Sequence, residues 1–174
     1  RNNISPGGSR RRPAAVLIDP RRPIPYDRKI GPIMITLSRE RFQKLVAEAI
    51  DGLPRSFRKK IENVAVLVED FPSAEIIEDL GLRSPWDLFG LYHGIPLDKR
   101  GSYYGNIPPD VILIFQKPLE RWAGTEDEIR DEVRSTVIHE VGHYFGFDEA
   151  GLRRAERESR RSESPAEEEN TDEQ

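Results

Sequence analysis

The stretch His139-Glu140-Val141-Gly142-His143 has the pattern H-E-x-x-H. Its two histidines are four residues apart, and residues at that spacing share one face of an α-helix. Both imidazoles can therefore reach one metal ion, and zinc binds such nitrogens at about 2.0–2.1 Å. Glu140 is placed to act as the general base on a water molecule at that metal. The pattern predicts a catalytic metal site.

The residues after the second histidine offer the remaining ligand. Gly146 follows His143 by three residues, where the helix can end and the chain can turn in the left-handed conformation. That turn brings the next carboxylates back toward the metal, so Glu149 and Asp148 are both candidates for a His-His-carboxylate site with one position left for water. The alternative, in which the histidines are core residues hydrogen-bonded to the backbone, does not explain Glu140.

Residues 139–149 resemble the H-E-x-x-H-x-x-G-x-x-(H/D) signature of the zincins, in the form where an acid replaces the third histidine. From about residue 33 to residue 152 the chain is similar to the small bacterial zincin-like metallopeptidases, sometimes called minimal zincins. The other matching segments are 34–37, 53–54, 63–66, 88–97, 101–105 and 109–110. The resemblance implies a zinc peptidase with Glu149 at the position of the third ligand. The family usually has aspartate at that position, which leaves Asp148 as a rival.

Two main helices are expected around this motif. Thr125 and Glu128 form a capping box at the start of the motif helix. The core-facing stripe of this helix is Ile129, Val133, Val137, Val141 and Tyr144. The other helix follows Ser38 as its N-cap and ends at Gly52 and Pro54. Its apolar stripe is Phe42, Leu45, Val46, Ala49, Ile50 and Leu53.

Apolar runs at residues 63–71, 88–92 and 111–115 predict strands, and residues 73–80 predict a short helix stopped by Gly81. The expected fold is therefore α+β and zincin-like, with a small mixed β-sheet packed against the two main helices. The H-E-x-x-H motif lies on one of these two helices.

Composition separates the two ends of the chain from its middle. The 174 residues are 36% hydrophobic and 33% charged, which is a low apolar content for a chain that is compact throughout. Residues 1–30 are rich in proline and arginine, and residues 153–174 are acidic without apolar periodicity. Such segments cannot bury enough apolar surface to offset their ordering entropy. We predict a mobile basic arm at 1–30, a zincin-like metallopeptidase domain at 31–152, and a charged, mostly disordered acidic tail at 153–174.

The net charge, the apolar runs and the cysteine content indicate which binding partners and which cellular location to expect. The net charge of −4 combines the basic arm with the acidic tail. The arm could bind nucleic acid through counterion release, but a solvated linker is favoured. No run of eighteen apolar residues predicts a membrane span. The absence of cysteine excludes disulfides and thiolate zinc ligands, and a cytoplasmic location is expected.

The expected function is a zinc-dependent peptidase that binds a peptide or protein substrate in extended form along a sheet edge, with residues 88–104 as the candidate edge. The alternatives are a metal-binding module without turnover and a nucleic-acid-associated protein that acts through its basic arm. His93 is a candidate ligand or substrate contact, although a structural hydrogen bond is favoured. Tyr103 and Tyr104 are candidate oxyanion donors, although strand packing is favoured.

Overall fold

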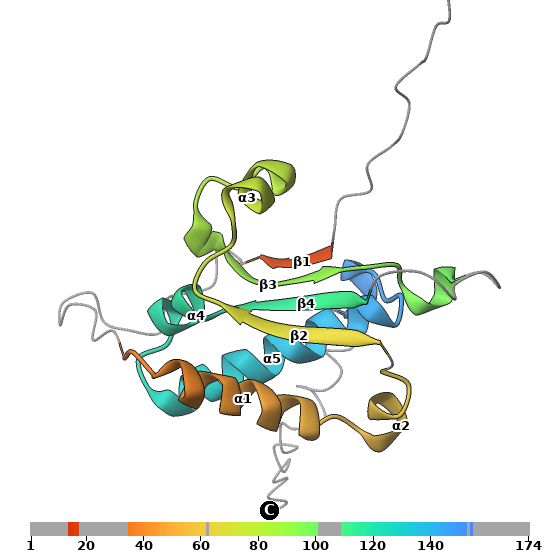
Figure 1. The fold of residues 1–174 in the computed structure, drawn as a ribbon, viewed down its shortest axis with the longest axis horizontal. Helices are drawn as coiled ribbons and strands as arrows, with labels where there is room; N and C mark the ends of the chain where they lie inside the picture. Colours follow the sequence, from red (N-terminus) through yellow and green to blue (C-terminus); the bar gives the residue numbers. More distant parts are fainter. Residues whose placement is uncertain (1–13, 18–34, 62, 101–108, 153, 155–174) are drawn as a thin grey trace, which may run out of the picture.

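The structure is a computed structural model that describes residues 14–17, 35–61, 63–100, 109–152 and 154. Its described strands are β1 (Ala14–Leu17), β2 (Val64–Glu69), β3 (Leu88–His93) and β4 (Asp110–Phe115). They form one mixed sheet in the order β1-β3-β4-β2 (Figure 1). The β2–β4 pair is parallel, and β3 is antiparallel to both of its neighbours. The three predicted strands are therefore present, and the mixed sheet is confirmed.

Strand β1 corrects the sequence interpretation at two places. It lies within residues 1–30, predicted as a mobile arm, yet Ala15 pairs with Leu91 in an antiparallel ladder along β3. The prediction is wrong for these four residues, and the rest of the arm lies outside the described residues. Because β3 has β1 on one side and β4 on the other, the part of the predicted edge that falls on β3 is also wrong.

Helices α1 (Arg39–Asp51) and α5 (Glu126–Tyr144) cover one face of the sheet, and α3 (Ala74–Leu80) lies over the other (Figure 1). Apolar side chains of α1 and α5 share one core with β3 and β4, including Phe42 and Val133, which are fully buried. Ile76 and Leu80 of α3 pack with Leu88 on the opposite face. Shorter helical segments include α2 (Arg55–Arg58), η1 (Pro85–Asp87), η2 (Leu97–Lys99) and α4 (Gln116–Trp122).

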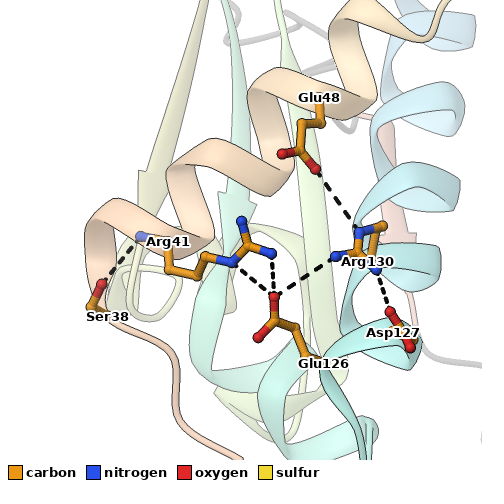
Figure 2. A network of polar contacts seen from close by, with 6 residues as sticks. All are labelled: Ser38, Arg41, Glu48, Glu126, Asp127 and Arg130. Carbon is orange, nitrogen blue, oxygen red and sulfur yellow. Dashed lines mark hydrogen bonds and ion pairs between the residues drawn. The ribbon is translucent and has the colours of Figure 1, made fainter.

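Local signals explain where the two main helices begin. The Ser38 hydroxyl accepts a hydrogen bond from the amide of Arg41, and the capping box predicted between Thr125 and Glu128 is present in both directions. The first turn of α5 also faces α1 through a polar network, in which the Glu126 carboxylate contacts the guanidinium groups of Arg41 and Arg130 (Figure 2). These partly exposed ion pairs orient the two helices and stabilise them less than the shared core does.

Helix α4 was not predicted, and a buried carboxylate holds it. It follows β4 directly, and its N-cap Phe115 provides no side-chain hydrogen bond. The fully buried Glu120 accepts hydrogen bonds from the backbone amide of Leu37 at 2.9 Å and from the Gln116 side chain at 2.7 Å. Lys117 adds an ion pair at 2.9 Å. A buried charge is tolerated only with such partners, so α4 is tied to the segment that leads into α1.

Candidate metal centre

Helix α5 presents both histidines of the motif near its C-terminal end. The ring centroids of His139 and His143 are 4.8 Å apart, as the spacing of four residues predicts for one helix face. The side chain of His143 is buried, and that of His139 is mostly buried. The Val137 and Val141 side chains, which belong to the predicted core stripe, are buried against the sheet side of the helix. The motif therefore sits on a helix that is fixed by its own apolar face.

The chain reverses direction directly after α5. Gly146 has φ of 93°, in the left-handed region, as the sequence predicts. A Cβ atom at this position would also overlap the carboxylate of Asp98. The amide of Phe147 donates to the carbonyl of Gly142 at 3.1 Å and closes the reversal. Residues 148–152 are consequently carried back along the side of α5.

This reversal brings Glu149 to the two histidines. Its Oε1 atom lies 3.0 Å from Nε2 of His143 and 3.3 Å from Nε2 of His139. Among the described residues, His139, His143 and Glu149 form a group whose ligand atoms all lie within 4.8 Å of one another. Asp148 is outside this group, because its Oδ1 accepts a hydrogen bond from the amide of Gly151 at 2.7 Å. The geometry thus favours Glu149 over its rival, and ligation by Glu149 stays a prediction.

The contacts of His143 are compatible with a cation in this group. Its Nδ1 donates to the carbonyl oxygen of Phe147 at 3.0 Å, which leaves the lone pair of a neutral imidazole on Nε2. That lone pair faces the Glu149 carboxylate at 3.0 Å, so two acceptors meet unless a proton or a metal ion lies between them. Tetrahedral zinc with bonds of about 2.0–2.2 Å separates its ligand atoms by about 3.3–3.5 Å. The two histidine–carboxylate distances, 3.0 and 3.3 Å, are close to this range.

The same contacts affect the acidity of Glu149. When protons rather than a metal ion lie between these groups, hydrogen bonds from His139 and, to a smaller extent, from His143 hold the pKa of the Glu149 carboxyl well below its ordinary value, and partial burial opposes them. Glu149 is therefore ionised throughout the neutral pH range, as a carboxylate ligand of zinc must be.

Glu140 lies beside the group but belongs to a different surface of the helix. Its side chain is completely buried between α5 and strand β3. Gly90 of β3 makes room for it, because a Cβ atom at residue 90 would lie 2.9 Å from Oε1 of Glu140 and 2.6 Å from Cγ2 of Thr136. We did not single out Gly90 from the sequence. An isolated glycine inside a strand is nevertheless a known sign of close approach by another element.

Substituting Gly90 with alanine should therefore destabilise the protein and displace Glu140. An added methyl group in a packed core costs about 1–3 kcal/mol of unfolding free energy. Thermal or denaturant unfolding measures this loss. The double variant Gly90→Ala/Thr136→Ser removes the closer contact and should recover part of the stability. Unchanged stability in Gly90→Ala would contradict the tight packing of β3 on α5.

An aromatic contact fixes the end of α5 next to the two histidines of the motif. The ring of Tyr144 packs edge-on against Tyr92 of β3 at 6.2 Å, and its hydroxyl donates to the carbonyl of Lys60 at 2.9 Å. Tyr92 in turn donates to Asp110 at 3.1 Å, and burial raises the pKa of Tyr92 above its ordinary value. Tyr92 therefore remains a neutral donor, and the contact between the two tyrosine rings holds the helix end against the sheet.

The other residues considered from the sequence are not part of this group. His93 ends β3 opposite Val111 and is exposed. Alternate residues of a strand face opposite sides of the sheet, so His93 points away from the face on which Tyr92 contacts α5. Tyr103 and Tyr104 lie outside the described residues.

Residues 61–159 match the family model of the zincin-like metallopeptidases, and this segment is more than half of the chain. The chain belongs to the zincin-like metallopeptidase family. The resemblance seen in the sequence is thereby confirmed, and so is the zincin-like fold class. The zincin-like match includes β2, β3, β4 and the whole of α5, whereas α1 and β1 lie before it. No curated protein matches the chain.

None of the helices that the structure describes is long and apolar enough to cross a membrane.

Proposed function

We propose that this protein is a zinc-dependent peptidase that uses Glu140 as its general base. The observation that carries the proposal is the convergence of His139, His143 and Glu149 beside Glu140, within a family of metallopeptidases. Two imidazoles and one carboxylate are a ligand set of catalytic zinc sites, which keep a fourth position for water or substrate. The proposed resident metal is therefore zinc, held by these three side chains.

The proposed chemistry divides the work among the side chains. Bound zinc would polarise the scissile carbonyl and lower the pKa of the attacking water. Glu140 accepts the proton of that water and passes it to the leaving amine. The burial of Glu140 against Gly90 keeps its carboxylate in one place, so little reorganisation is required when the proton moves. Glu149 and the histidines stay outside the proton transfer and serve as ligands.

The proposed substrate is a peptide or protein segment in extended form. Such a segment can add to a sheet edge through backbone hydrogen bonds. In the described part of the chain, β1 already occupies the side of β3 away from β4. A substrate that pairs with β3 must therefore displace β1. The cytoplasmic location stays a prediction. Binding of nucleic acid by residues 1–30 stays the less favoured alternative to a solvated linker, and most of that arm lies outside the described residues.

One observation favours a second candidate function, a metal-binding module without turnover. Glu140 has no exposed surface, whereas a general base must reach the attacking water. A site that binds zinc while its carboxylate stays covered would hold the metal without hydrolysing peptides.

Metal removal separates the two candidates. The purified protein should contain about one zinc per chain, because three protein ligands and one water complete the site. For the peptidase, a strong chelator should abolish cleavage of a broad library of unstructured peptides, and added zinc should restore it. Full zinc occupancy without cleavage of any library peptide would instead support the metal-binding module and remove the peptidase assignment.

A further inference from the structure

The residues that follow the reversal enter a helical segment, described at 149–152 and at 154, and Glu149 is the first residue of its first turn. Asp148 stands directly before it. The Oδ1 atom of Asp148 accepts from the amide of Gly151 at 2.7 Å, and its carbonyl accepts from the amide of Leu152 at 3.0 Å. These are the two hydrogen bonds of an N-cap residue. Asp148 therefore starts the turn that carries Glu149.

The C-terminal end of this turn packs against α5, the helix that carries the H-E-x-x-H motif. Leu152 is buried, and a Cβ atom at Gly142 would overlap its Cδ2 atom. Leu152 thus fills the space that a side chain at Gly142, between the two histidines, would need. At the near end, the amide of Phe147 bonds to the Gly142 carbonyl. The turn is attached to α5 on both sides of Glu149.

Glu149 is placed by the backbone of this turn as well as by its contacts with the histidines. Its side chain is 44% exposed, so the path of its backbone decides where the carboxylate stands. We propose that Asp148 is a positioning residue, which holds Glu149 at the histidine pair by capping the turn that Leu152 seats against Gly142. This inference rests on the proposed metal centre. In this proposal Asp148 caps the turn through its hydrogen bonds and does not itself bind the metal.

Asparagine and aspartate are equally good N-caps, and a neutral amide is a poor zinc ligand. The Asp148→Asn variant should therefore bind zinc about as tightly as the wild type, measured by competition with a chromophoric chelator. The Asp148→Ala variant loses the cap, and we expect its zinc affinity to fall about 2- to 30-fold, which is the cost of a lost cap expressed as a binding ratio. Asp127→Ala, an exposed carboxylate at the other end of α5, is the matched control and should change nothing.

Two further measurements test whether the backbone of this turn is held in place. In the metal-free protein, amide hydrogen exchange at Leu152 should become faster in Asp148→Ala and stay unchanged in Asp148→Asn. Gly142→Ala should also weaken zinc binding, because its methyl group displaces Leu152, although alanine favours the helix itself.

Each outcome is decisive. Zinc binding that falls equally in the asparagine and alanine variants would make Asp148 a ligand and overturn the proposal. Wild-type zinc affinity or unchanged Leu152 exchange in Asp148→Ala would overturn it as well. If the wild-type protein binds no zinc, the metal centre itself is refuted. If the wild type binds zinc but the Asp148 variants give one of the contrary results above, only the positioning role of Asp148 is refuted.

Discussion

The double variant His139→Ala/His143→Ala should contain no zinc after purification and should take up none in titration. Loss of a hydrogen-bond partner behind a metal ligand already costs about 10- to 100-fold in affinity, so loss of two direct ligands costs more. The variant should still fold, because the side chains that attach α5 to the core, such as Ile129 and Val133, are unchanged and fully buried. Metal analysis together with circular dichroism measures both properties.

The third histidine of the chain provides a matched control. His93 is exposed and faces away from α5, so His93→Ala should keep one zinc per chain. Full zinc occupancy in the double variant would refute the assignment of the metal centre to α5. Loss of zinc in His93→Ala would show that this assignment is incomplete.

The Glu140→Gln variant should keep its zinc and its fold but hydrolyse peptides about 10²- to 10⁴-fold more slowly than the wild type. Glutamine has the same shape as glutamate, so the space between α5 and Gly90 can accept it. Its amide cannot take the proton of the attacking water. Single-turnover cleavage of the best library peptide, at equal zinc content, measures the effect.

Glu132→Gln is a suitable control for this experiment. Glu132 lies on the same helix, two turns before the motif and outside the metal group, so its variant should cleave at the wild-type rate. If Glu140→Gln cleaves as fast as the wild type, then the hydrolysis does not depend on this carboxylate and the proposed mechanism is wrong.

Much of the fold could be predicted because its signals are local. Ser38 and Thr125 cap their helices through amides only three residues away, and both caps are present. The left-handed turn at Gly146 follows from the intolerance of other residues for that conformation. The strands near residues 63–71, 88–92 and 111–115 are apolar runs long enough to be recognised.

Other elements were missed because their partners are distant in sequence. Helix α4 has no capping side chain, and Glu120 stabilises it by accepting from Leu37, 83 positions earlier in the chain. Strand β1 is a run of four residues among prolines and arginines, and its pairing with β3 spans more than seventy residues. The need for glycine at position 90 comes from Glu140 on α5, which no local pattern near β3 indicates.

The sequence by itself determined the motif helix, the face shared by His139 and His143, and the point at which the chain turns back. These features depend on helical spacing and on backbone conformations within a few residues. Only the tertiary structure decided that Glu149, rather than Asp148, stands at the histidine pair, and that β1 covers the side of β3 expected to be an edge. The physical reason is that neighbouring carboxylates are equivalent in a pattern. Asp148 and Glu149 become different only when Leu152 packs against Gly142 and thereby orients the turn that carries Glu149.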